Sequence, residues 1–144
     1  MRYVYPVTIE RDDDGRYLAT APDVPEAITD GESEEAALCE MSDALAAALA
    51  GYSIEGRDSP TPSRPAPGQS LVPVAPLVAA KLALRAAMRD EGISNVALAQ
   101  RLGISEGAVR RLVNPDHASR LDGVVLALAA MGHRLIVEAQ RAAR

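Results

Sequence analysis

Four polar side chains close together late in the chain have the chemistry to contact nucleic-acid bases. They are Ser105, Glu106, Arg110 and Arg111. An arginine guanidinium can make two hydrogen bonds to guanine, and a glutamate carboxylate can accept one from cytosine. Each arginine could equally belong to an ordinary solvated helix face, so the elements that hold these side chains decide between the two interpretations.

The surrounding stretch, residues 95–114, has the pattern of a helix-turn-helix. Ser94 is placed to cap a first helix, Ala99 is small enough for two helices to approach, and Gly103 can adopt a left-handed turn. Ser105 would then cap a second helix, although an ordinary helical hairpin could use the same turn. In a helix-turn-helix the second helix reaches base edges and nearby helix ends meet phosphates. The predicted DNA-binding residues are therefore Ser94, Asn95, Ser105, Glu106, Arg110, Arg111 and Arg120.

Further helices are predicted on both sides of this motif. One covers residues 77–90 and the other residues 119–131, each with an apolar face. The polar side of the first carries Lys81, Arg85 and Arg89. Residues 133–138, HRLIVE, predict a short terminal strand or an extended arm whose apolar side chains need a partner. A second subunit could supply that partner, so we expect a homodimer or a higher oligomer.

The N-terminal part of the chain predicts a small β-sheet and one helix. Alternating apolar residues give a strand over 3–10, and further strands are predicted over 17–21, 26–30 and, more briefly, 52–57. Pro6 lacks a backbone donor, so its strand lies at an edge or places Pro6 at an unpaired position. Ser33 is placed to cap the helix and Gly51 to end it. The predicted fold class is therefore α+β, with this sheet and helix joined to an all-α helix-turn-helix domain.

Composition divides the chain into three predicted parts. Residues 59–76 hold six of the ten prolines and predict a linker. The acidic domain before it, residues 1–58, carries 14 Asp and Glu against 4 Arg, a net charge of −10. The domain after it, residues 77–144, carries 10 Lys and Arg against 6 acids, a net charge of +4. This asymmetry indicates two kinds of partner, and only the second domain tolerates DNA.

No group of residues has the spacing of a catalytic or metal site. The run DDDG at residues 12–15 lies between two predicted strands, which favours a solvated hairpin tip over a calcium loop. His117 and His133 are far from that run, and Cys39 has no base placed by sequence to activate it. Neither of the Gly-rich phosphate-binding motifs occurs. We therefore predict no enzyme activity, no metal and no cofactor.

Two further features bear on where the protein works. A single cysteine excludes an internal disulfide. There is no run of 18 apolar residues and no signal-peptide pattern at the N-terminus, so we expect a soluble cytoplasmic protein without a membrane partner.

The order of short motifs along the chain resembles the HicB antitoxin family. In the first half the motifs are Tyr5-Pro6, Asp12 to Gly15, Ala21 to Pro25, Thr29 to Gly31 and Glu35-Ala36. In the second half they are Lys81, Leu98 to Gly103, Arg111-Leu112 and Ser119 to Asp122. One departure is Glu26-Ala27, where the family commonly has Gly-Cys.

This resemblance implies both a fold and a partner for each domain. Residues 1–58 would form a partial RNase H-like fold without a nuclease site. They would bind a small HicA-type toxin, an mRNA interferase, and their acidic balance independently suits a basic partner. The helix-turn-helix domain would bind operator DNA of its own operon as a dimer.

Three functions are open at this point. The first is a type II antitoxin that neutralises an mRNA-interferase toxin and represses its own operon. The second is a ligand-sensing transcriptional regulator with an acidic sensor domain. The third is a nuclease that uses Asp12 to Asp14 and a metal ion. The charge split, the linker and the helix-turn-helix favour the first.

Overall fold

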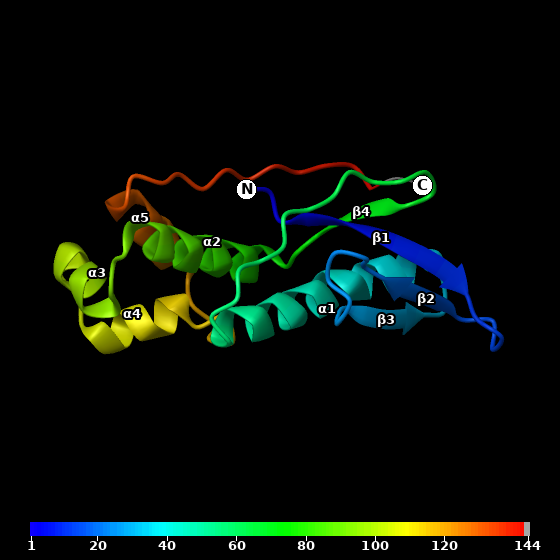
Figure 1. Cartoon of the computed structure of the whole chain (residues 1–144), viewed down its shortest axis with the longest axis horizontal. Coiled ribbons are helices and arrows are strands. Elements are labelled where there is room, and N and C mark those ends of the chain that lie inside the picture. Colours follow the sequence, from blue (N-terminus) through cyan, green and yellow to red (C-terminus); the bar gives the residue numbers. More distant parts are fainter. Residues whose placement is uncertain (143–144) are drawn as a thin grey trace. The chain divides into compact units, whose positions relative to one another are not determined.

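The structure is a computed structural model that describes residues 1–142. It divides into two compact units, a first unit from Met1 to Pro76 and a second unit that begins at Leu77. The first unit combines strands with one long helix, and the second is helical, so the predicted α+β class is confirmed (Figure 1). None of the described helices is both long enough and apolar enough to cross a membrane.

The first unit contains a four-stranded antiparallel sheet. Its strands are β1 (Val4–Arg11), β2 (Tyr17–Thr20), β3 (Ile28–Gly31) and β4 (Ser70–Pro73), in the order β3-β2-β1-β4. Three of them, β1, β2 and β3, confirm strands predicted from the sequence. The position of Pro6 is also explained, because β1 pairs with β4 over Val4–Val7 and with β2 over Thr8–Arg11. Each half of β1 thus pairs with one neighbouring strand only. A proline whose nitrogen faces the unpaired side removes no hydrogen bond from the sheet.

The helix of this unit, α1 (Glu34–Ile54), is longer than predicted. Ser33 caps it as expected, with its Oγ accepting from the Ala36 amide at 3.1 Å. Gly51 does not end it, and the strand predicted over residues 52–57 is wrong. The helix continues because Tyr52 is buried, and it ends at Ile54, two residues before Gly56, whose φ is +74°.

The Pro-rich segment is only partly what its composition predicted. Residues 70–73, placed in a linker from sequence, form β4 and pair with β1. The preceding residues are bonded to the same unit: the Tyr5 hydroxyl donates to the Pro60 carbonyl at 2.7 Å, and Ser63 donates to Asp23 at 2.6 and 2.8 Å. The prediction of a linker over the whole of residues 59–76 is therefore wrong for this strand.

In the described part of the second unit, four helices pack around one apolar core. They are α2 (Pro76–Glu91), α3 (Asn95–Leu102), α4 (Glu106–Val113) and α5 (Leu121–Ala130). Each of the four contributes buried side chains to that core, among them Leu84, Leu98, Val109 and Val124. The core holds the two short helices α3 and α4 at fixed positions.

The C-terminal segment has no regular secondary structure over residues 132–142. The terminal strand predicted over residues 133–138 is therefore absent from the single chain, and the alternative of an extended arm describes it. Leu135 packs against the core of the second unit, while Ile136 and Val137 are 87% and 79% exposed. A strand needs a neighbouring strand to pair with.

Candidate functional site

The turn between α3 and α4 has the geometry that its sequence predicted. Ser94 and Ser105 cap the two helices, each with its Oγ 3.1 Å from the amide nitrogen three residues on. Gly103 adopts the left-handed conformation, with φ of 67° and ψ of 33°. Its position allows the Ile104 amide to donate to the Ala99 carbonyl at 3.1 Å. These bonds close α3 and begin α4 within three residues, as a helix-turn-helix requires.

One face of α4 is buried and the other is free to meet a ligand. Val109 and Val113 lie in the core, whereas Glu106, Arg110 and Arg111 are exposed. The Arg110 Nε lies 3.8 Å from a Glu106 carboxylate oxygen, and both side chains are at least half exposed. An exposed pair of this kind contributes little to stability, so either group can exchange it for a contact with DNA.

A second group of predicted residues lies at the start of α3. Ser94 and Asn95 line a hollow of about 330 Å³ together with Arg85 and Arg89 of α2. Partial burial and the charge of Arg89 lower the pKa of the Arg85 guanidinium. Two nearby guanidinium groups beside the N-terminus of a helix form an electropositive surface suited to phosphate.

The structure thus separates the seven predicted DNA-binding residues into three places. Ser94 and Asn95 lie at the start of α3, and the four residues of α4 and its cap lie along one helix. Arg120 is the exposed N-cap residue of α5, and its assignment depends on sequence position alone.

The sequence did not predict where the side chains of Arg85 and Lys81 lie. Arg85 was placed on a polar helix side, and its proximity to the start of α3 is a tertiary contact without a local signal. Lys81 was placed on the same polar side, yet its side chain is fully buried. A signal did exist: Lys81 follows Leu77 by four residues and precedes Leu84 by three, which puts it on the apolar face.

The first unit carries more carboxylates than cations. A hollow of about 480 Å³ beside β3 is lined by Arg16, Thr29, Asp30, Gly31, Glu32, Ala36 and Glu40. The Arg16 Nε donates to the Asp30 carboxylate at 2.8 Å, and this bond lowers the pKa of Asp30. β3 is also an edge of the sheet, and Ile28 on it is 58% exposed.

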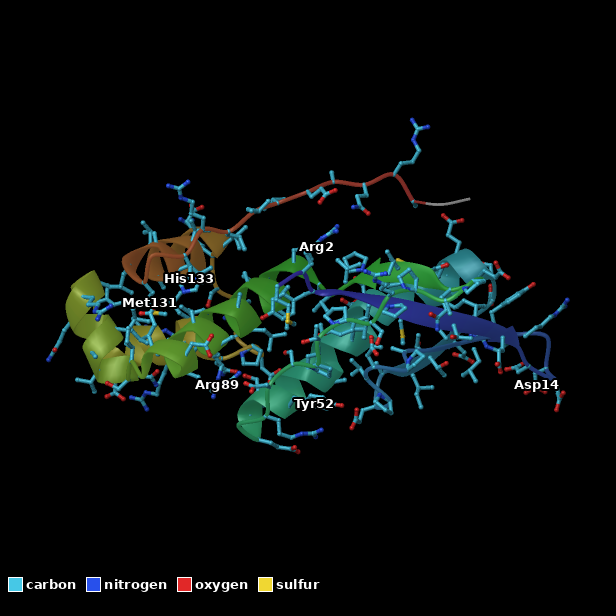
Figure 2. All side chains as sticks on the ribbon, turned by 45° about the horizontal axis from the view of Figure 1, so that its top comes forward. Arg2, Asp14, Tyr52, Arg89, Met131 and His133 are labelled. Carbon is cyan, nitrogen blue, oxygen red and sulfur yellow. The ribbon has the colours of Figure 1, made fainter. Side chains whose placement is uncertain are left out.

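The aspartate run forms the tip of the β1–β2 hairpin, where Figure 2 labels Asp14. An Asp12 carboxylate oxygen accepts from the backbone amides of Asp14 and Arg16, each at 2.9 Å. This carboxylate therefore has a structural part in closing the turn. Within residues 1–142, no three His, Cys, Asp or Glu side chains are grouped as metal ligands.

Comparison with known proteins matches each unit. A family model described as the HicB_like antitoxin of a bacterial toxin-antitoxin system matches residues 4–83. A model described as winged helix-turn-helix DNA-binding matches residues 81–115, which cover most of α2 and all of α3 and α4. No strand occurs in the described part of the second unit, so this match concerns the helices and not a wing.

Whole-chain relatives carry the name of the same family. "Antitoxin HicB 2" of Photorhabdus laumondii is 37% identical over 131 residues, which are 91% of this chain and 92% of the relative. "Antitoxin HicB" of Escherichia coli K12 is 34% identical over 91% of this chain and 95% of the relative. "Antitoxin HicB" of Pseudomonas fluorescens is 29% identical over 97% and 96%. With the sheet, α1 and the helix-turn-helix in the order that the sequence predicted, the chain belongs to the HicB-like antitoxin family.

Proposed function

We propose that the protein is a type II antitoxin and autorepressor. The first unit binds and neutralises a small mRNA-interferase toxin of the HicA type, and the second unit binds operator DNA of the same operon. Membership of an antitoxin family together with an exposed, basic α4 face in a helix-turn-helix carries this proposal. Neither unit needs catalysis, a metal or a cofactor for these tasks, and both tasks place the protein in the cytoplasm.

In the DNA complex, the start of α4 enters the major groove. Ser105, Glu106, Arg110 and Arg111 contact base edges or the phosphates that flank them, and Ser94, Asn95 and Arg120 contact the backbone. We add Arg85 to the phosphate-binding group, because it lines the same hollow as Ser94 and Asn95.

The proposed toxin-binding surface lies on the first unit. Residues 1–58 carry the net charge of −10, and the hollow beside β3 concentrates several of these carboxylates. A basic toxin approaches such a surface faster than a neutral protein does. The same surface repels an acidic competitor. Co-expression tests this half: the toxin should lose its activity and co-purify with the antitoxin. A toxin that stays fully active and elutes alone would refute it.

The proposed oligomer is a homodimer, or a higher oligomer built from dimers. A net charge of +4 on residues 77–144 is modest for DNA binding. One positive residue of this count, Lys81, is buried and contributes no surface charge for contacts. Two helix-turn-helix units on a two-fold axis would double the contacts and read two half-sites.

Substitution of the α4 arginines tests the DNA-binding half. Arg110→Ala and Arg111→Ala should each weaken binding to a duplex from the promoter region by about 1–3 kcal/mol where the side chain contacts a base. A phosphate contact would instead lower the salt-dependence slope by about 0.9 per arginine. Arg64→Ala, which removes the same charge from an exposed position of the first unit, is the matched control. Mobility shifts at several fixed salt concentrations measure both quantities, and equal affinities for all three variants would refute the assignment.

A further inference from the structure

A lysine lies fully buried in the core of the second unit. Lys81 of α2 has no exposed surface, and its Nζ has four polar neighbours. They are the carbonyl oxygens of Arg111 at 2.9 Å, Asn114 at 2.9 Å and His117 at 2.6 Å, and the Ser119 Oγ at 2.7 Å. All four are neutral acceptors, and three ammonium hydrogens serve them, so one hydrogen is shared.

The four neighbours belong to one segment, the last turn of α4 and the connection to α5. Arg111 is in α4, Asn114 is its C-cap residue, and His117 and Ser119 follow. The segment has internal bonds as well: the Asn114 side-chain oxygen accepts from the Asp116 amide at 3.0 Å, and the Ser119 hydroxyl donates to the Arg111 carbonyl at 3.2 Å. The Lys81 ammonium group thus hydrogen-bonds to residues along the whole of this segment.

A cation at this point acts on a helix that has little stability of its own. α4 has eight residues and includes Gly107, and helices this short are marginal in isolation. Its last carbonyl groups lack partners inside the helix. A positive charge there also interacts favourably with the negative end of the helix dipole. Lys81 supplies hydrogen bonds and charge together.

The cost of burying this charge argues for a specific purpose. An ammonium group in a low-dielectric core loses its hydration, and burial accordingly lowers the pKa of Lys81. An apolar side chain of similar length would fill the same space without that cost. An apolar side chain has no hydrogen-bond donor, so it would not fix the directions of the three backbone carbonyl groups.

We infer that Lys81 is a positioning residue for DNA binding, whose buried ammonium holds the last turn of α4 and so directs Arg110 and Arg111 toward the operator. This inference rests on the proposed DNA-binding function. The carbonyl of Arg111 itself is one of the bonded groups, so a shift of the ammonium is passed directly to a residue proposed to contact DNA.

Two variants of the full-length chain separate positioning from general stability. Lys81→Met keeps an unbranched side chain of similar length and removes the ammonium. Leu84→Ala, one turn along the same helix, opens the same core and leaves the carbonyl groups bonded. Both are measured below the onset of unfolding on a duplex from the promoter region upstream of the gene. We expect Lys81→Met to bind at least tenfold more weakly and Leu84→Ala to stay within threefold of the wild type.

Amide hydrogen exchange provides a readout that a loss of stability alone would not change. The amides of Asn114, His117 and Ser119 donate within the bonded segment, whereas the Val109 amide donates at the start of α4. In Lys81→Met the first three should exchange faster relative to Val109. In Leu84→Ala all four should accelerate by a similar factor.

Each outcome decides the inference. Wild-type affinity in Lys81→Met, or an equal loss in Leu84→Ala, overturns it. If Lys81→Met does not fold, Ser119→Ala removes one acceptor near the surface and should weaken binding about threefold, with the same local acceleration of exchange; unchanged affinity there overturns the inference. If the wild-type chain binds no promoter DNA at low salt, the proposed function fails instead, and the exchange pattern alone then decides whether Lys81 holds the α4 terminus.

Discussion

A very close backbone contact occurs at Gly31, where β3 ends against α1. A Cβ added there would lie 2.5 Å from the Ala37 amide nitrogen and 3.0 Å from the Ala36 carbonyl carbon. Neither backbone atom can move without displacing the first turn of α1. Gly51, inside α1, is the opposite case, because an added Cβ would meet no described atom within 4 Å.

These two glycines should therefore respond in opposite directions to the same substitution. We expect Gly31→Ala to lower the free energy of unfolding of the first unit by about 1–3 kcal/mol through overpacking. Gly51→Ala should raise it by about 0.5–1 kcal/mol, because alanine loses less backbone entropy in a helix. All four tyrosines lie in the first unit, so tyrosine fluorescence during urea unfolding reports this unit alone. Effects of the same sign would contradict the proposed reasons.

A hydrogen bond from the Tyr52 hydroxyl to the Glu26 carboxylate should make this unit sensitive to acid. The bond lowers the pKa of Glu26 below its ordinary value of 4.5. A depressed carboxyl pKa contributes stability above the unfolded-state pKa, and that contribution is lost as pH falls through the folded-state pKa. Tyr52→Phe removes the bond and keeps the ring, over which the Arg57 guanidinium lies at 3.8 Å.

The wild type should therefore unfold at a higher temperature than Tyr52→Phe at pH 7, and the difference should shrink below about pH 4.5. Thermal melts followed by tyrosine fluorescence at several pH values measure it. A difference that is constant across this range would show that the hydroxyl stabilises the unit by another route.

At the scale of residues, capping chemistry was predictable, whereas the tertiary partners of a buried polar group were not. Ser33, Ser94, Ser105 and Gly103 act as predicted because their effects depend on neighbours within four residues. Lys81 differs because a tertiary cluster of carbonyl groups compensates its burial, and no local pattern announces such a cluster.

At the scale of elements, β4 was hidden by its surroundings. It follows a segment rich in proline, and its partner strand lies more than 60 residues earlier in the chain. Once formed, it behaves as an ordinary strand, with Val72 buried and Leu71 51% exposed. Gly51 was misleading for a related reason, since the burial of Tyr52 outweighs the tendency of glycine to end a helix.

Truncation should show that the first unit needs β4. A fragment of residues 1–58 lacks β4 and the buried Val72 and Val74, and it exposes the edge of β1. We expect this fragment to be unfolded or strongly destabilised, whereas a fragment of residues 1–76 should fold cooperatively. Circular dichroism and tyrosine fluorescence in urea compare them. A stable 1–58 fragment would restore the whole of residues 59–76 as a linker.

At the scale of the whole molecule, the two units differ in charge in the same way as their proposed partners require. Residues 1–76 carry 14 acids against 5 arginines, and residues 77–144 carry the positive excess. The net charge of +4 makes only a modest electrostatic contribution to DNA affinity, and the acidic charge of the first unit mainly speeds encounter with a basic partner. Affinity for DNA must therefore come from positioned contacts and from the number of units that bind together.

The C-terminal arm, residues 133–142, offers a way to bring two copies of the chain together. Ile136 and Val137 are β-branched and largely exposed, and residues 133–142 form no strand in the single chain. Two such arms could pair across a two-fold axis and cover these side chains, which makes the contact self-complementary. We therefore expect the full-length chain to have the mass of a dimer, or of a multiple of it, by light scattering.

Placing a charge in the arm should dissociate this assembly. Ile136→Asp puts a carboxylate where the apolar contact is expected, and Gln140→Asp adds the same charge four residues later as the matched control. The first should give a monomer that binds promoter DNA at least tenfold more weakly, because one unit makes half the contacts. The second should keep the wild-type mass. A monomeric wild type, or an Ile136→Asp variant with unchanged mass, would exclude the arm as the dimer contact and leave the operator to be read by single units.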